Sequence, residues 1–167
     1  DVEIMTLSIA SLMSVHDELD AIFLEHQRAL LHLDRSSALT ALERYEDCLM
    51  RHMNDEEDKL LPIYSERCEF PAVGAPKLFL DEHEKMRAHT ALLIGSTAAL
   101  ADADDIEKAV LRLLGHEAFY LRLCGHHDKR EAEYLYPLLD AALSDDEKLG
   151  LLEHVWTGSE RSSTASV

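Results

Sequence analysis

Apolar residues return at helical spacing along most of the chain. Between about residues 6 and 34, Leu12, Leu19 and Phe23 share one face of a helix, with charged and amide side chains between them. A second stretch with the same period runs from about residue 37 to residue 68, after a short polar segment that offers capping side chains. Because the connection is short, the two predicted helices are expected to be antiparallel neighbours.

Two more long helices are predicted in the second half of the chain. A break that contains Pro71 and Pro76 precedes a helical pattern that reaches about residue 100. A fourth pattern runs from about residue 105 to residue 143, and a short fifth helix follows a sequence typical of a capping box and ends near Trp156. The sequence therefore predicts an all-α fold, an up-down-up-down four-helix bundle with a short C-terminal fifth helix.

Length and composition agree with this prediction. The 167 residues suffice for one domain with a buried core, and six glycines and four prolines are few for such a chain. Leucine, alanine and glutamate, which favour helices, recur throughout. We expect one domain over residues 1–157 and a disordered tail over residues 158–167.

The charge of the chain excludes some classes of partner. A formal net charge of −17 would repel a phosphate backbone or an anionic membrane, so nucleic acid and membrane are not expected as partners. No apolar run approaches the roughly 18 residues of a membrane span, and the first residues lack the basic start of a secretory signal. The three cysteines have no framework spacing and are interpreted as reduced thiols, which points to the cytoplasm.

One pairing of residue types occurs on both the second and the fourth predicted helix. A histidine is followed four residues later by a glutamate, which places the imidazole and the carboxylate on one helix face, about one turn or ~6 Å apart. The pairs are His52 with Glu56 and His127 with Glu131. The first helix of each predicted hairpin adds one inward histidine. These two are His16 and His83.

The repeat extends beyond the two pairs. In each half a tyrosine precedes the histidine by seven residues, a cysteine precedes it by three or four, and a proline follows the glutamate by six. In chain order these residues are Tyr45, Cys48, Pro62, Tyr120, Cys124 and Pro137. A proline inside a helix costs about 3 kcal/mol, so the matched placement indicates one structural device used twice. The tyrosines and cysteines are candidates for groups beside the site, and simple core packing is the alternative for both.

Imidazole and carboxylate together are ligands for iron, manganese or zinc, and in helix bundles such ligands project inward from facing helices. Two ions sharing the two carboxylates would each take two histidines and one oxygen from each glutamate. A bridging oxide or hydroxide would supply a fifth ligand. An octahedral ion would then keep one position for a small molecule such as dioxygen, peroxide or nitric oxide.

The pattern His, His-x-x-x-Glu, His, His-x-x-x-Glu, together with the segments 52–57 and 60–62, resembles the hemerythrin-like (HHE cation-binding) family. Within it the chain is most similar to the di-iron domain of the repair-of-iron-centres proteins, which are linked to nitrosative stress and iron-sulfur cluster repair. The resemblance covers about residues 6–142. It implies two oxo- or hydroxo-bridged iron ions and the following ligands: His16 and His52 on one iron, His83 and His127 on the other, and Glu56 and Glu131 bridging them.

The chain departs from the family pattern at one point. The oxygen-carrying hemerythrins have a further histidine on the third helix, but Phe79 and Arg87 stand four residues either side of His83. This difference weighs against reversible oxygen carriage. We therefore expect a non-heme di-iron protein that binds or reacts with dioxygen, peroxide or nitric oxide, with a role in nitrosative or oxidative stress or in iron homeostasis.

Two alternatives stay open. One is an oxygen or iron sensor without turnover that signals to a protein partner, as in the iron-sensing hemerythrin-like domain of a ubiquitin-ligase subunit. The other is a metal-free helical interaction protein. The sequence does not decide whether the protein is an enzyme. Of the remaining histidines, His26 lies about 15 Å along the helix from His16 and is expected at the surface or in a second layer around the site.

Overall fold

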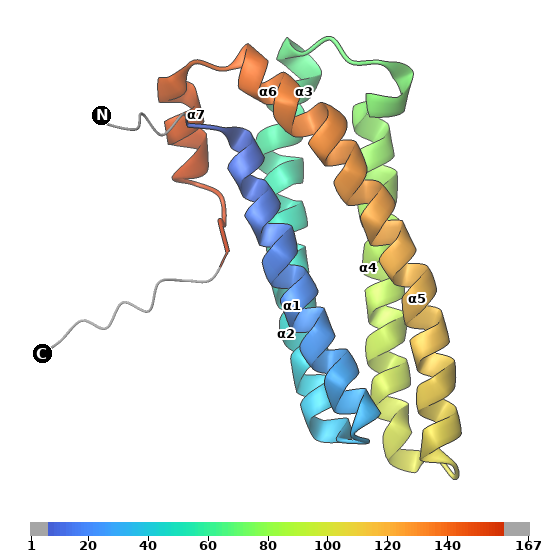
Figure 1. The fold of residues 1–167 in the computed structure, drawn as a ribbon. Coiled ribbons are helices and arrows are strands. Elements are labelled where there is room, and N and C mark those ends of the chain that lie inside the picture. The colour runs from blue at the N-terminus through green and yellow to red at the C-terminus, as the bar shows by residue number, and fades with distance from the viewer. Residues whose placement is uncertain (1–6, 159–167) are drawn as a thin grey trace, which may run out of the picture.

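The computed structural model describes residues 7–158, and this part of the chain is built from helices (Figure 1). The helices are α1 (Met13–Leu31), α2 (Arg35–Asp55), α3 (Leu61–Arg67), α4 (Pro76–Ala98), α5 (Ile106–Arg130), α6 (Tyr136–Ala142) and α7 (Asp145–Leu152). The prediction of a four-helix bundle with a short C-terminal helix is confirmed. Apart from Gly158, the tail predicted at residues 158–167 lies outside the described residues.

The bundle consists of two helical hairpins. Helix α1 packs against α2 and α4 against α5, while contacts of α1 with α5 and of α2 with α4 close the ring. The short helices α3, α6 and α7 gather at one end, and the α1–α2 and α4–α5 connections lie at the other (Figure 1). Short 3-10 turns at Ile9–Leu12, Ala72–Gly74 and Ala99–Asp102 complete the connections.

Side-chain caps set the start of several helices, as the sequence indicates. The Asp34 carboxylate accepts from the backbone N–H of Ser37 at the start of α2, and Asp105 does the same for α5. At α7 the predicted capping box is present, with Ser144 and Glu147 each accepting a hydrogen bond from the other's backbone N–H. These contacts satisfy donors that a helix start leaves without partners.

A π-helical turn interrupts each helix that carries a His-x-x-x-Glu pair. The turns are Glu56–Leu60 and Glu131–Leu135, so each begins at the glutamate of its pair. The N–H of Leu61 donates to the carbonyl of Glu56, five residues back instead of four, and Tyr136 donates to Glu131 in the same way. The helical patterns predicted over about residues 37–68 and 105–143 thus each contain a π turn that the sequence analysis does not include.

The matched prolines explain the matched turns. Pro62 and Pro137 each stand in the first turn of the helix that follows a π turn, α3 and α6 respectively. In a regular α-helix the proline ring would clash with the carbonyl one turn back, and the wider π turn relieves that clash. The repeated device that the sequence indicates is thus a π turn followed by a proline, present once in each half of the chain.

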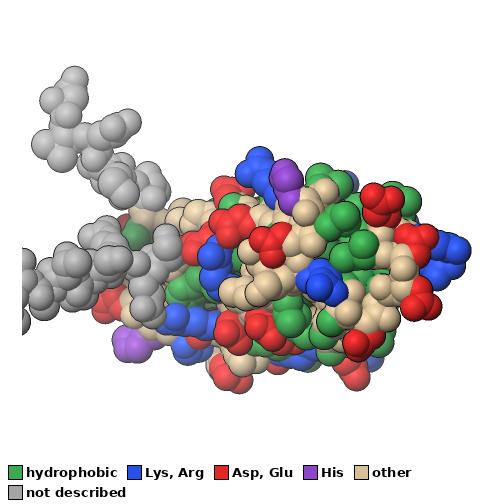
Figure 2. All heavy atoms as spheres, turned by 90° about the horizontal axis from the view of Figure 1, so that it is seen from below, with side chains coloured by type: hydrophobic (Ala, Val, Ile, Leu, Met, Phe, Trp, Pro, Cys, Tyr) green, Lys and Arg blue, Asp and Glu red, His purple; other side chains and the backbone are tan. Residues whose placement is uncertain are grey.

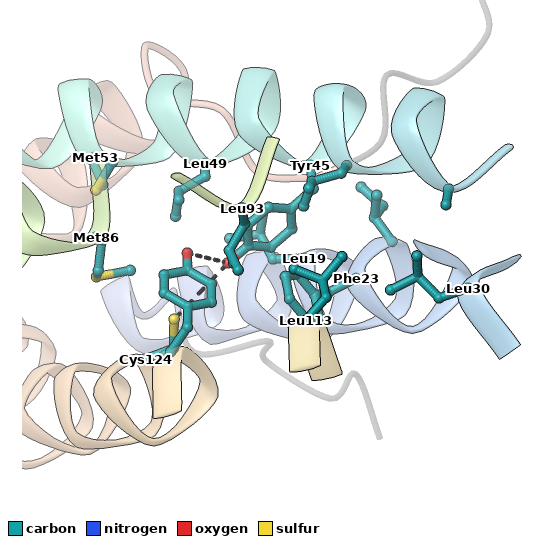
Figure 3. Close-up of a cluster of buried hydrophobic side chains, with 14 of the residues drawn as sticks. Leu19, Phe23, Leu30, Tyr45, Leu49, Met53, Met86, Leu93, Leu113 and Cys124 are labelled. Carbon is teal, nitrogen blue, oxygen red and sulfur yellow. Dashed lines mark hydrogen bonds between the residues drawn. The ribbon is translucent and has the colours of Figure 1, made fainter. Parts of the chain in front are cut away.

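The core contains two apolar clusters. The larger cluster fills the long part of the bundle, where Phe23 of α1, Tyr45 and Leu49 of α2 and Leu93 of α4 face one another (Figure 3). The smaller cluster lies at the end closed by α3 and α6, around the fully buried Tyr64. The predicted ligands fall between the two clusters. Met53 of the larger cluster precedes Glu56 and Leu60 of the smaller one follows it, and Cys124 and Leu135 flank Glu131 in the same order.

None of the helices between residues 7 and 158 combines the length and apolar character that a membrane span needs. Figure 2 shows the end of the molecule that carries the α1–α2 and α4–α5 connections. Acidic and basic side chains are interspersed there with hydrophobic ones. This face offers no continuous basic surface for a phosphate backbone.

A separate polar group lies within the larger apolar cluster. His26 is fully buried, its Nδ1 atom lies 2.8 Å from the Ala38 carbonyl, and its Nε2 atom lies 2.7 Å from Glu117 Oε1. The Gln27 side chain donates to the other Glu117 oxygen at 2.9 Å. His26 was expected at the surface or around the site, and this expectation was wrong. The residue is buried, and its partner Glu117 lies on α5, 91 residues further along the chain.

Removing the Glu117 carboxylate should strongly destabilise the protein. In Glu117→Ala, His26 and Gln27 keep their buried polar atoms but lose their shared partner, which should cost about 3–5 kcal/mol in the free energy of unfolding. Urea denaturation would measure this. Glu107→Ala, which removes an exposed carboxylate from the same helix, should cost less than about 1 kcal/mol. Equal effects of the two substitutions would contradict a stabilising role for the buried group.

Candidate metal centre

The structure brings together all six side chains that the sequence predicts as metal ligands. All six are buried, and they are contributed by helices α1, α2, α4 and α5 and by the first residue of each π turn. They are His16, His52, Glu56, His83, His127 and Glu131. The spacing of four residues on α2 and α5 aims each histidine and its glutamate at the same interior point.

The four histidines form two pairs. The Nε2 atoms of His16 and His52 lie 3.0 Å apart, and those of His83 and His127 lie 3.1 Å apart. Each pair joins one histidine from the first helix of a hairpin to one from the second. The sequence analysis predicts the same pairing.

Each glutamate spans both histidine pairs. Glu56 places Oε1 3.6 Å from the Nε2 atom of His52 and Oε2 3.3 Å from that of His83. Glu131 likewise places Oε2 3.0 Å from His16, and Oε1 lies 2.6 Å from His127. One oxygen of each carboxylate therefore faces each pair.

These atoms could hold a metal ion. The side chains of Glu56, His83, His127 and Glu131 offer ligand atoms within 4.8 Å of one another, and His16 and His52 form a second such group with Glu131. Glu56 Oε2 and Glu131 Oε1 are buried and have no well-aligned hydrogen-bond donor among the described residues, although His127 Nε2 approaches Glu131 Oε1 closely. Buried acceptors without donors are costly, and a cation among them would satisfy both oxygens. The residues therefore fit a metal.

The outer nitrogens of one histidine pair are held by carboxylates. His83 Nδ1 lies 2.8 Å from Glu57 Oε1, and His127 Nδ1 lies 3.0 Å from Glu82 Oε2. Because an ionised carboxylate only accepts, each Nδ1 carries the proton and donates it outward. In the neutral form of each ring the Nε2 lone pair then points toward the centre, as in many metal sites where a carboxylate orients a histidine ligand.

Arginines keep these two carboxylates ionised. Arg87 donates to Glu57 at 2.8 Å, and the Arg130 Nε–H donates to Glu82 at 3.1 Å. Partial burial alone would raise the pKa of both carboxyl groups. The hydrogen bonds from the arginine and the histidine outweigh burial and lower each pKa below its usual range.

The other histidine pair is less firmly held at His16. Its Nδ1 atom is buried without a hydrogen-bond partner, and an oxygen of Asp128 lies 3.6 Å away, beyond hydrogen-bond distance. Burial raises the pKa of the Asp128 carboxyl to about 6, although nearby His16 acts to lower it. The two histidine pairs therefore differ in the hydrogen bonds that orient their rings.

Tyr136 reaches the centre, and the sequence analysis did not include it. Its hydroxyl donates to Glu56 Oε1 at 2.6 Å and lies 3.3 Å from Glu131 Oε2. Burial and the two carboxylates raise the pKa of this hydroxyl well above its usual range, so it stays protonated and can donate. A sequence signal exists in hindsight, since Leu61 occupies the matching place before the other proline and the repeat is broken there.

The two predicted tyrosines form a hydroxyl chain. The hydroxyl oxygens of Tyr45 and Tyr120 lie 2.7 Å apart (Figure 3), and Thr90 Oγ1 lies 3.2 Å from Tyr120 and 2.7 Å from the Met86 carbonyl. The Thr90 hydroxyl can donate to the Met86 carbonyl or to the Tyr120 oxygen, and either tyrosine hydroxyl can donate to the other. The two tyrosines therefore belong to one buried hydrogen-bonded group.

A small cavity of about 20 Å³ adjoins the ligands. Tyr45 and Cys124 line it together with His16, His52 and His127, whereas Cys48, which the structure also describes, is not among its lining residues. A cavity of this size holds about one water-sized molecule. Of the two predicted cysteines, only Cys124 is thus placed beside the candidate centre, with its sulfur 4.0 Å from the Tyr45 hydroxyl.

Comparison with known proteins adds no assignment. No protein-family model matches the chain, no curated protein matches its sequence, and no solved structure matches its fold. The candidate centre must therefore be judged on its geometry.

Loss of the Glu82 carboxylate should weaken metal binding. In Glu82→Ala, His127 loses the acceptor that orients its ring, and affinity for ferrous or zinc ion should fall about 10–100-fold. Competition with a coloured chelator would measure it. Glu84→Ala removes an exposed carboxylate two residues away and should bind metal like the parent. Equal affinities of the two variants would show that Glu82 does not support a metal ligand.

Proposed function

We propose that this chain is a non-heme di-iron protein of the hemerythrin-like type that binds or reacts with a small molecule such as nitric oxide, peroxide or dioxygen. In this proposal His16 and His52 bind one ion, His83 and His127 bind the other, and the two glutamates bridge them. The observation that carries the proposal is that each buried carboxylate presents one oxygen to each histidine pair.

The assignment of iron follows from the chemistry of the ligands and from the family resemblance. Two oxygens and four imidazole nitrogens suit iron, manganese or zinc. The resemblance to the hemerythrin-like family favours iron. When bound, a pair of iron ions would supply electron transfer to or from a small ligand.

The surroundings of the centre support a small molecule as its partner. The cavity beside the ligands has room for about one water-sized molecule, so larger substrates are excluded. The exposed Asp20 and the partly exposed Asp128 line it, so the wall between α1 and α5 is nearest to solvent. Tyr136 stays protonated and donates a hydrogen bond to Glu56, which fixes the orientation of that carboxylate.

We further propose a role in nitrosative or oxidative stress or in iron homeostasis, within the cytoplasm. The described cysteines Cys48, Cys68 and Cys124 are all free thiols, which is compatible with a reducing compartment. The same proposal includes a protein partner and catalytic turnover of the small molecule as properties to be tested.

Removal of a bridging carboxylate should abolish the stabilisation that metal gives. The parent should lose melting temperature in chelator and regain it with ferrous ion under anaerobic conditions, because metal at 100 times its Kd stabilises by about 2.7 kcal/mol. Glu56→Ala should contain little metal and show no such shift. Asp58→Ala, which removes an exposed carboxylate from the same turn, should behave like the parent. A variant Glu56→Ala that keeps both metal content and metal-dependent melting would refute the bridging role.

Filling the cavity should slow reaction with small molecules. The reduced, iron-loaded protein would be mixed with nitric oxide, peroxide and dioxygen in turn and followed by stopped-flow optical spectra. Cys124→Leu, with metal content verified, should react at least about tenfold more slowly, a barrier increase of ~1.4 kcal/mol. Cys48→Leu changes the matching cysteine outside the cavity and is the control.

The outcomes of this experiment also separate the alternatives. A sensor would bind iron and be stabilised by it, yet give no rapid reaction with peroxide or nitric oxide. A stable, reversible dioxygen adduct would instead indicate carriage. If the purified chain contained no metal and bound none, the result would favour the alternative of a metal-free helical interaction protein.

A further inference from the structure

A second hollow lies away from the candidate centre, between α4 and α5. It is a groove of about 460 Å³, within the range of small-molecule sites in proteins. Its apolar surface includes Leu92 and Phe119, whose side chains are 66% and 55% exposed. Exposed leucine and phenylalanine on adjacent helices make an apolar surface that a bound ring would cover.

A glycine opens the groove. Gly115 belongs to its lining, and a Cβ atom built on Gly115 meets nothing within 4 Å. A side chain at this position would occupy open space beside the groove. The absence of a side chain at this point of α5 therefore contributes directly to the empty space.

The polar groups that line the groove can each donate a hydrogen bond. His89, Ser96 and His116 line it, and among the described residues that line the groove none is acidic. The Arg122 guanidinium lies 5.8 Å from the centre of the Phe119 ring. In a chain with a net charge of −17, a groove with this lining is complementary to an anionic group at short range, since the field of distant charges is screened within about 10 Å at 0.1 M salt.

The aromatic surface sets the shape of the ligand. The rings of His89 and Phe119 lie 5.4 Å apart at 51°, so they pack against each other and form an aromatic wall of the groove on which a flat molecule can lie. His89 also lies 6.3 Å from the ring of Tyr120, whose hydroxyl belongs to the chain that leads to the small cavity. The groove is thus connected to the surroundings of the candidate centre through one side chain, that of Tyr120.

We propose that this groove binds a planar aromatic anion of one or two rings, with its ring system over Gly115 and against Phe119 and its anionic group toward the histidines and Arg122. A second copy of the chain is a poorer occupant, because two chains of net charge −17 repel each other. The proposal does not depend on the metal centre, and metal-free protein should bind the ligand too.

Calorimetric titration with 2-naphthoate would test the site in the parent and two variants. The parent should bind one equivalent, and Gly115→Leu, which fills the groove, should raise the Kd about tenfold or more. Gly125→Leu is the matched control, because Gly125 lies on the same helix and its Cβ would also meet nothing within 4 Å. Arg122→Met should weaken naphthoate more than the neutral 2-naphthamide. Circular dichroism would verify that each variant is folded.

Several results would overturn the proposal. Titration of the parent without saturable binding would refute it, and so would equal Kd values for Gly115→Leu and Gly125→Leu. Sedimentation of the parent as a dimer that Gly115→Leu converts to a monomer would show instead that the groove is a contact between two copies. Stronger binding of the amide than of the carboxylate would exclude the anionic class.

Discussion

Two carboxylates, those of Glu56 and Glu131, are buried side by side in the interior of a helix bundle, and the surrounding structure is arranged to tolerate them. A buried carboxylate is costly unless it is paired and hydrogen-bonded. Tyr136 donates to Glu56, but one oxygen of each glutamate has no well-aligned donor among the described residues. Imidazole nitrogens surround these oxygens at short distances. A metal cation would complete the group, because it could be bound by the imidazole nitrogens and the carboxylate oxygens together.

The position of this group in the bundle keeps its geometry fixed. Apolar clusters lie on both sides, so the four long helices are packed above and below the ligands and have little freedom to rotate. The π turns add a local adjustment at Glu56 and Glu131, because an extra residue in the turn changes the direction of the side chains that follow. Packing on both sides and the two wide turns together determine where the carboxylates point.

Much of this arrangement could be predicted from the sequence, because it depends on spacing along single helices. Apolar periodicity gives the bundle, and residues four apart must share a helix face, which is enough to group His52 with Glu56 and His127 with Glu131. The π turns could not be predicted, since the matched prolines indicate a disturbance but not its hydrogen-bond pattern. Glu82 and His26 were missed for another reason. Their partners stand on other helices, and such contacts depend on how the helices rotate against one another.

The two halves of the chain match in sequence but not in surroundings, and this difference bears on chemistry at the centre. His83 and His127 are oriented by carboxylates that arginines hold in turn, whereas His16 has no partner for its outer nitrogen. The cavity adjoins His16, His52 and His127, and Cys124 lines it while its counterpart Cys48 does not. A centre that reacts with a small molecule needs rigid ligands on one side and access on another. A symmetric pair of hairpins would give both sides the same environment, so the difference arises from Glu57 and Glu82, which orient one histidine pair, and from the absence of such a partner at His16 Nδ1 among the described residues.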